Sequence, residues 1–253
     1  MPEQLLDFTG KVVLITGARS GIGQATAVAF AKQGAKVVLA GRSNVDETLE
    51  RIKKVGGEAI FVKGDVSIAA DVQRFVNTAV DTYGSLDVAF NNAGLLPVAA
   101  NLADQTEEDF DRIMAVDSKG VFLCMKYEIK QMLKQGGGAI INVGSVVSLV
   151  ADPGMAPYVA AKHAVAGLTK AAAQEYIKDN IRINAIAPGF TATEMTAGWM
   201  ADPQMCELVK SYNAAHRIAS PDEIAGIALY LASPLASFTA GAIIPVDAAQ
   251  TAH

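Results

Sequence analysis

The fold of this chain is decided by the stretch Val12-Val13-Leu14-Ile15-Thr16-Gly17-Ala18-Arg19-Ser20-Gly21-Ile22-Gly23. Its first part is almost continuously apolar, which predicts a strand covered on both faces, as strands of parallel sheets are. A helical pattern follows at residues 24–33. The glycines therefore lie between a buried strand and a helix, in the first βαβ unit of the chain.

The glycines of this turn are spaced GxxxGxG rather than GxGxxG. Glycine lets the backbone turn tightly and approach a pyrophosphate, which then lies at a helix N-terminus where free N–H groups and the helix dipole favour an anion. The alternative is an ordinary tight connection between strand and helix. The turn residues that we predict to bind a cofactor are Gly17, Arg19, Ser20, Gly21, Ile22 and Gly23.

Short β-branched runs alternate with longer helical segments along the rest of the chain, and that alternation predicts a parallel sheet covered by helices. The expected strands are 12–16, 36–41, 59–63, 86–91, 138–143, 182–187 and 242–246. The expected helices are 21–33, 45–54, 69–82, 106–134, 157–178 and 221–232. We predict an α/β protein with one domain, residues 1–253, built on a doubly wound (Rossmann) sheet of about seven parallel strands with helices on both faces.

Composition excludes several other classes of protein. A chain of 253 residues that is 51% hydrophobic and 19% charged can bury a core and is not disordered. A net charge of −5 disfavours nucleic acid as a partner. The two cysteines and three histidines form no metal-ligand or disulfide pattern, so we expect no metal. No apolar stretch is long enough to span a membrane and the start lacks a signal-peptide pattern, so we expect a cytoplasmic protein without a membrane partner.

The residues after the second strand indicate which nicotinamide cofactor would bind. A carboxylate placed there would bind the ribose 2′-hydroxyl of NAD, but this chain has Gly41, Arg42 and Ser43. A guanidinium can hold a 2′-phosphate through charge-assisted hydrogen bonds, and Arg19 would approach the same phosphate. These residues predict NADP(H) rather than NAD(H). The alternative is that Arg42 is a solvated surface side chain.

Tyr158 and Lys162 are four residues apart, so a helix presents both on one face. A nearby cation favours the phenolate and lowers the pKa of tyrosine, so that the phenol can act as an acid or a base. Ser145 follows the expected strand 138–143, at the carboxyl edge where open α/β sheets bind ligands. A hydroxyl there would hold a substrate oxygen beside the phenol.

The segment 190–215 lies between an expected strand and an expected helix. It contains Met195, Trp199, Met200 and Met205, side chains that suit a lid closing over a substrate pocket. The alternative is an ordinary surface helix that covers the core. We predict a lid, and the expected substrate-binding residues are Ser145, Val147, Met155, Tyr158, Phe190 and Trp199, with Leu95, Leu96 and Val146 as further candidates.

Several motifs occur in a fixed order along the chain. They are the turn 16–23, Asp65-Val66, Asn91-Asn92-Ala93-Gly94, Ser145, Tyr158 with Lys162, Asn184, Pro188-Gly189 and Thr193. Together they resemble the short-chain dehydrogenase/reductase family over nearly the whole chain. The resemblance implies that Tyr158 is the general acid/base, that Ser145 orients a carbonyl, and that Lys162 lowers the pKa of Tyr158 and holds the nicotinamide ribose. The further cofactor contacts that we expect are Asp65, Val66, Asn91, Ala93, Gly94, Pro188, Gly189, Thr191 and Thr193.

The chain departs from the family pattern at two places. Asp117 stands where the family usually has an asparagine that serves a proton relay, and an ionised carboxylate accepts hydrogen bonds but does not donate them. We count Asp117 among the catalytic candidates, linked to Lys162 through a water; the alternative is a buried, hydrogen-bonded acid without a catalytic role. The second departure is Val246-Asp247-Ala248-Ala249, where the family commonly has two glycines.

These observations predict an enzyme that transfers hydride between NADPH and an apolar ketone or aldehyde, a carbonyl reductase or secondary alcohol dehydrogenase in which Tyr158 exchanges the proton. One alternative is reduction of a 3-oxoacyl thioester on an acyl carrier protein, which uses the same motifs. A second, from a different class, is a non-catalytic NADP(H)-sensing protein, for which Asp117 is the only support. The resemblance also implies a homotetramer or a homodimer.

Overall fold

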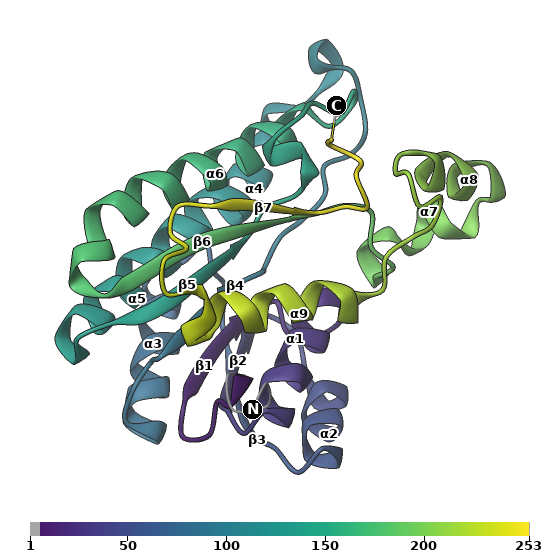
Figure 1. The fold of residues 1–253 in the computed structure, drawn as a ribbon. Coiled ribbons are helices and arrows are strands. Elements are labelled where there is room, and N and C mark those ends of the chain that lie inside the picture. The colour runs from purple at the N-terminus through teal and green to yellow at the C-terminus, as the bar shows by residue number, and fades with distance from the viewer. Residues whose placement is uncertain (1–5, 253) are drawn as a thin grey trace.

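The computed structural model describes residues 6–252 of the chain. These residues form one seven-stranded sheet in the order β3-β2-β1-β4-β5-β6-β7, and every neighbouring pair of strands is parallel (Figure 1). The strands are β1 Val12–Thr16, β2 Lys36–Gly41, β3 Glu58–Lys63, β4 Val88–Asn91, β5 Gly138–Val143, β6 Ile181–Pro188 and β7 Ile243–Val246. The predicted single-domain, doubly wound sheet is confirmed.

Helices cover both faces of this sheet, as Figure 1 shows. They are α1 Gly21–Lys32, α2 Asp46–Lys54, α3 Ala69–Tyr83, α4 Glu107–Ile113, α5 Val121–Gln135, α6 Ala156–Tyr176, α7 Ala197–Ala201, α8 Pro203–Ser211 and α9 Pro221–Ala232. Single 3₁₀ turns occur at η2 Leu102–Asp104, η4 Val146–Ser148, η5 Ile177–Asp179, η6 Glu194–Thr196 and η7 Pro234–Ala236. Within residues 6–252, no helix has the length and apolar character needed to cross a membrane.

The alternation of side chains along each strand explains why the apolar runs are continuous. In β1, Val12 and Leu14 pack into one core with α3, α5 and α6, whereas Val13 and Ile15 pack into a second core with α1, α2 and α9. Successive side chains of a strand point to opposite faces, so a strand covered on both sides presents apolar residues to both cores. All five residues of β1 are buried.

The predicted helix 106–134 is interrupted in the structure. It begins as α4, with the Thr106 hydroxyl accepting from the Asp109 backbone N–H (3.1 Å), and continues through the π-helical segment η3 Met114–Gly120 into α5. A π turn adds one residue to the helical repeat and is often associated with a functional site. Asp117 lies in this segment and is fully buried.

The segment 190–215 contains no single long helix. It contains η6, α7 and α8, and Figure 1 shows α7 and α8 standing beside the carboxyl ends of the strands, away from the two helix layers. Asp202 caps α8 by accepting from the backbone N–H groups of Gln204 (2.8 Å) and Met205 (3.3 Å). The segment thus consists of short helices rather than one long helix, and α8 buries only Val209.

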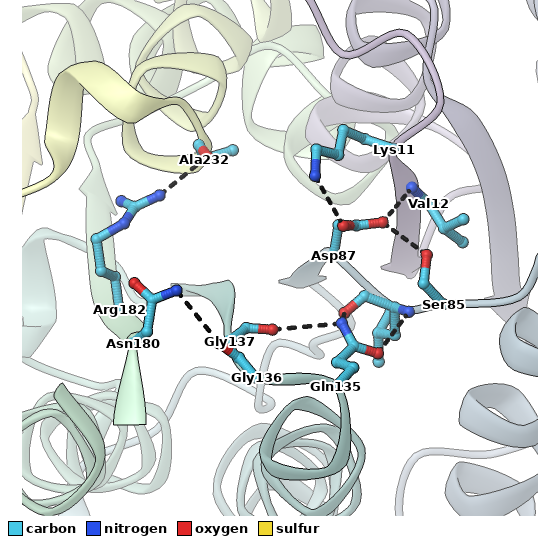
Figure 2. Close-up of polar contacts among 11 residues, drawn as sticks. Lys11, Val12, Ser85, Asp87, Gln135, Gly136, Gly137, Asn180, Arg182 and Ala232 are labelled. Atoms are coloured by element: carbon cyan, nitrogen blue, oxygen red, sulfur yellow. Dashed lines mark hydrogen bonds and ion pairs between the residues drawn. The ribbon is translucent and has the colours of Figure 1, made fainter. Parts of the chain in front are cut away.

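Polar side chains tie the amino ends of the strands together, at the opposite edge of the sheet from the cavity described below. Asp87 accepts hydrogen bonds from the Val12 backbone N–H (3.0 Å) and the Ser85 hydroxyl (2.7 Å) and pairs with the Lys11 ammonium (3.1 Å) (Figure 2). Burial raises the pKa of Asp87, but these three donors outweigh burial and the net direction is downward. Asp87 therefore binds β1 to the start of β4 as a carboxylate.

Replacing Asp87 with alanine is expected to lower the free energy of unfolding by about 1–3 kcal/mol, because the fully buried Val12 would lose its acceptor. The effect is on stability rather than on chemistry, since Asp87 lies at the amino edge of the sheet. Urea denaturation measures the loss, and kcat of the folded variant should stay at the native value. An unchanged denaturation midpoint would contradict this role of Asp87.

Candidate active site

A cavity of about 790 Å³ opens at the carboxyl edge of the sheet. The strand order changes direction between β1 and β4, and open parallel sheets bind ligands at such a switch point because the chain leaves adjacent strands toward opposite faces there. The residues that follow β1, β2 and β3 line what we call the glycine-turn end: Gly17–Ile22, Gly41–Ser43 and Gly64–Val66. The apolar end is lined by Leu95, Leu96, Val146, Val147, Met155, Phe190 and Trp199.

Backbone geometry explains the glycines of the turn. Gly17 and Gly21 have φ values of +66° and +57°, a region that other residues rarely adopt. A Cβ atom on Gly23 would lie 2.3 Å from the Gly17 carbonyl oxygen, so only glycine lets α1 pack this closely against the turn. Gly23 itself does not line the cavity.

The N-terminus of α1 is available to an anion. Ser20, its N-cap residue, makes no capping hydrogen bond, and the first turn of α1 contains no acidic residue. Because the first backbone N–H groups of a helix have no partner within the helix, they bind a phosphate well. The glycine-turn end therefore fits the diphosphate of a dinucleotide.

Two arginines of the glycine-turn end are paired with carboxylates. The Arg42 guanidinium lies 3.8 Å from Asp65 and is 62% exposed, and Arg19 forms an ion pair with Glu194 at the start of the segment 190–215. Both guanidiniums lie at the cavity wall, where a phosphate group would compete with these carboxylates.

Ser145, Tyr158 and Lys162 all line the cavity and lie beside one another. Ser145 follows β5 and caps the 3₁₀ turn η4, and Tyr158 and Lys162 lie one turn apart on α6. The Lys162 Nζ lies 5.3 Å from the centre of the Tyr158 ring and donates to the Val143 carbonyl oxygen (3.1 Å). The cation therefore faces the phenol, as the spacing predicts.

Asp117 joins this group from the π-helical segment. Its Oδ2 lies 3.2 Å from the Lys162 Nζ, and its Oδ1 accepts from the Leu95 backbone N–H (2.8 Å). The contact with Lys162 is an ion pair, and it is the polar contact that Oδ2 makes among the described residues. Asp117 thus contacts Lys162 directly rather than through a water. It is also a buried, hydrogen-bonded acid, as the alternative hypothesis expects.

The net effect on the Tyr158 phenol differs from the sequence-based expectation. Burial, the largest cause, raises the pKa of Tyr158, and Asp117 raises it further. Lys162 lowers this pKa as expected, and so does the Ser145 hydroxyl. The net direction is upward. Burial also acts to lower the pKa of Lys162, yet Tyr158 and Asp117 outweigh it and raise that pKa. Lys162 therefore stays charged.

The cavity is also lined by three polar residues that the sequence analysis did not single out. They are Asp152, Tyr212 and Gln250. Burial raises the pKa of Asp152, and burial together with Asp152 raises the pKa of Tyr212. The side-chain oxygen of Gln250 is buried and has no hydrogen-bond partner among the described residues. No local motif marks them, because they reach the cavity from separate loops.

Of the predicted site residues, Asn91 and Gly23 lie outside the cavity lining and all the others line it. The Asn91 amide instead donates to Glu128 (2.9 Å) and to Asn142 (3.0 Å) in the core. Burial raises the pKa of Glu128 from 4.5 to about 8. The part of the chain that the structure describes contains no group of three or more potential metal-ligating side chains.

Comparisons with known proteins agree with this geometry. Residues 17–250 match a family model described as enoyl-(acyl carrier protein) reductase. An uncharacterised oxidoreductase of Thermotoga maritima is 45% identical over 98% of this chain and 100% of its own length. The chain belongs to the short-chain dehydrogenase/reductase family.

Other members of the short-chain dehydrogenase/reductase family have named activities. A cyclohexanol dehydrogenase of Acinetobacter sp. is 39% identical, covering 96% of each chain, and a 3-oxoacyl-[acyl-carrier-protein] reductase of Synechocystis sp. is 39% identical over 95% of this chain and 96% of its own. A crystal structure of an Agrobacterium tumefaciens protein with bound NADP has a TM-score of 0.92 at 35% identity, covering 98% of this chain and 99% of that one.

The second departure from the short-chain dehydrogenase/reductase pattern has a structural counterpart. After β7, Ala248 and Ala249 adopt φ values of +47° and +67°, the left-handed region in which glycine is favoured. The Asp247 carboxylate holds this turn by accepting from the Ala249 (3.1 Å) and Thr251 (2.9 Å) backbone N–H groups. Asp247 thus stabilises a turn that glycines would form without strain.

Proposed function

We propose that this oxidoreductase is an NADP(H)-dependent carbonyl reductase, or secondary alcohol dehydrogenase, that acts on an apolar ketone or aldehyde. The observation that supports it most is the meeting of Ser145, Tyr158 and Lys162 between the glycine-turn end and the apolar end of one cavity. A carbonyl group at that junction would have a proton donor on one side and the nicotinamide on the other.

The nicotinamide cofactor supplies the hydride when it is bound. Tyr158 donates its phenolic proton to the carbonyl oxygen as that oxygen becomes an alkoxide, and it recovers a proton from solvent after turnover. The Ser145 hydroxyl donates a hydrogen bond to the same oxygen and so stabilises the developing charge. Lys162 stabilises the phenolate that remains. In alcohol oxidation each step runs in reverse.

The lining of the cavity favours an uncharged substrate. Of the described residues that line it, only Arg19, Arg42 and Lys162 are basic, and all three have roles at the glycine-turn end or beside Tyr158. An anionic carboxylate or phosphate at the apolar end would meet Asp152 instead of a cation. This composition supports a neutral ketone or alcohol and fits the relationship to a cyclohexanol dehydrogenase.

Reduction of a 3-oxoacyl thioester on a carrier protein is the second candidate, supported by the relationship to the Synechocystis reductase. A panel of small cyclic and acyclic ketones tested beside 3-oxoacyl thioesters, with NADPH and with NADH, separates the two. We expect higher kcat/KM for the ketones. Preference for the thioesters would replace our proposal with the second candidate, and no oxidation of NADPH with either panel would leave the cofactor-sensing alternative.

Cofactor preference is testable at Arg42. Arg42→Ala is expected to weaken NADPH binding by about tenfold, because a charge-assisted hydrogen bond to the 2′-phosphate is lost from an exposed site, and to leave NADH binding almost unchanged. Fluorescence titration with each cofactor measures both constants. Arg51→Ala, at an exposed arginine of α2 that pairs with Glu47, is the matched control. Equal weakening of NADPH and NADH would contradict a 2′-phosphate contact.

We also propose that residues 190–215 act as a lid. Phe190, Thr193, Trp199 and Tyr212 from this segment line the cavity, and Phe190 packs against Trp199 with ring centres 5.5 Å apart. The ion pair between Arg19 and Glu194 connects the lid to the glycine turn. Binding of a cofactor phosphate near Arg19 would therefore affect the position of the lid.

Association into a homodimer or homotetramer is supported by exposed apolar side chains. Phe238 is 102% exposed, and Phe110, Phe122 and Leu235 are each more than 40% exposed. A contiguous exposed apolar patch marks an interface, and the proposed association requires these side chains to lie in one. Sedimentation analysis measures the number of subunits.

A further inference from the structure

Asp117 and Lys162 form an isolated pair of opposite charges in the protein interior. Their side chains are 0% and 4% exposed, and Oδ2 of Asp117 lies 3.2 Å from Nζ of Lys162. A single buried charge is strongly disfavoured, whereas a buried pair at this distance can remain charged. The two opposite charges therefore largely cancel in their electrostatic effect on neighbouring groups.

We propose that Asp117 is a positioning residue that neutralises Lys162 and thereby keeps the proton on Tyr158. This inference rests on the proposed function and concerns the control of the same site. Lys162 alone would draw the phenol toward phenolate, but Asp117 compensates its charge. The enzyme therefore holds a protonated Tyr158, ready to donate to a carbonyl oxygen, up to higher pH than a lysine without a carboxylate would allow.

The groups that face this pair come from several elements. From α6, Tyr158 faces Lys162; from the end of β5, Ser145 faces Tyr158; and from α4, the more distant Arg112 acts on Asp117. Arg112 has its own partner, because it pairs with Asp109 and donates to the Leu96 carbonyl oxygen (3.0 Å). Lys162 is therefore the principal cation that acts on Asp117.

The remaining contacts hold Asp117 in place for this role. Leu95 N–H donates to Oδ1, which orients the carboxylate so that Oδ2 faces Lys162. A Cβ atom on Gly94 would lie 2.8 Å from Oδ2, so the backbone at Gly94 closes around the carboxylate on the cavity side. Burial raises the pKa of Asp117, Lys162 and the Leu95 N–H lower it, and the net direction is upward, so the contact with Lys162 at 3.2 Å is what keeps the carboxylate charged.

An asparagine at this position would act differently. Its amide oxygen can accept from Leu95 N–H as Asp117 does, so the local structure is retained, but it has no charge to compensate Lys162. In Asp117→Asn the Tyr158 phenolate becomes the anionic partner of the buried ammonium, and this pairing favours the phenolate. The substitution therefore removes the charge at position 117 while keeping the shape of the side chain.

The test uses the full chain without cofactor or substrate. The near-ultraviolet absorbance of tyrosinate is followed against pH in the native protein and in Asp117→Asn, each compared with the same protein carrying Tyr158→Phe, so that the difference belongs to Tyr158. We expect phenolate to appear at lower pH in Asp117→Asn. Because no turnover is needed, this result does not depend on the proposed reaction, and the two proposals can fail separately.

The kinetic counterpart is the pH profile of alcohol oxidation, which requires the phenolate. In Asp117→Asn we expect the acid limb of kcat/KM to move to lower pH, with an increase of about tenfold on that limb, the size of a one-unit shift. A residue with only a structural role would lower the whole profile without moving it along the pH axis.

Asp111→Asn is the matched control, since it removes an exposed carboxylate from the same helical run and should leave both titrations unchanged. If Asp117→Asn does not fold, as judged by circular dichroism, Asp117→Ser provides a smaller neutral side chain and the same expected direction. Titration of Tyr158 at the native pH, or at a higher pH, in the folded neutral variant would overturn the proposal.

Discussion

Replacing Tyr158 with phenylalanine is expected to reduce kcat by about 10³-fold, within the range typical of a lost general acid. The substitution removes the hydroxyl group and retains the aromatic ring that lies beside the Lys162 ammonium. Affinity for NADPH should stay almost unchanged, because the proposed cofactor contacts other than the Tyr158 hydroxyl are all retained. Steady-state oxidation of NADPH measures the first effect and fluorescence titration measures the second.

Tyr83→Phe is the matched control for this substitution. Tyr83 ends α3, its hydroxyl is buried without a hydrogen-bond partner among the described residues, and its ring lies under Lys36 at the amino edge of the sheet. Loss of that hydroxyl should leave turnover at the native rate. Native turnover in Tyr158→Phe would show that another group supplies the proton and would remove the central assignment.

Replacing Glu128 with glutamine is expected to change the pH dependence of stability strongly. Glu128 lies on α5, is 0% exposed and accepts a hydrogen bond from Asn91 (2.9 Å). Its second oxygen and the side-chain oxygen of Asn91 both have no donor among the described residues. A proton on Glu128 would supply a donor at this site, which agrees with a neutral carboxyl in the core.

The sign follows from the two pKa values of Glu128, about 8 in the folded chain against the ordinary 4.5. Below pH 4.5 both states are protonated and Glu128 adds no pH dependence. Between these values the folded state holds one more proton than the unfolded state, so stability falls as pH rises, by about 1.4 kcal/mol per pH unit. By pH 7 the accumulated loss is about 3 kcal/mol.

The glutamine in Glu128→Gln cannot ionise. Between pH 5 and pH 8 the free energy of unfolding of this variant should therefore decline less steeply than that of the native protein, and the two slopes should differ by about 1.4 kcal/mol per pH unit. Urea denaturation at a series of pH values measures both curves. Glu107→Gln, at an exposed position of α4, should follow the native curve. Parallel curves for Glu128→Gln and the native protein would mean that Glu128 is already ionised in the folded state.

Much of the fold was predictable because its signals are local. The strand 12–16 and the helix 221–232 were predicted with the bounds that the structure has, since continuous apolar runs and a Ser220-Pro221 start identify them without tertiary information. The helix 106–134 was not predicted correctly in detail, because a π turn depends on packing that no short-range pattern contains.

In the candidate site, too, contacts between residues close together in the sequence were predictable and contacts between distant segments were not. Spacing alone predicted that Lys162 faces Tyr158, because both lie on one helix. Asn91 was expected at the cofactor on the basis of resemblance, but its side chain binds Glu128 and Asn142, residues that only folding brings to it. Glu128 itself had no sequence signal, since a charged residue within a helix is normally exposed.

The sequence by itself determined the doubly wound sheet, the glycine turn at its carboxyl edge and the pairing of a phenol with an ammonium on one helix, because each depends on residues that are close together in the chain. Only the tertiary structure decided which charges those groups experience. Asp117 reaches Lys162 from another segment and both side chains are buried beside Tyr158. A pKa depends on burial and on every nearby charge, whatever its position in the sequence.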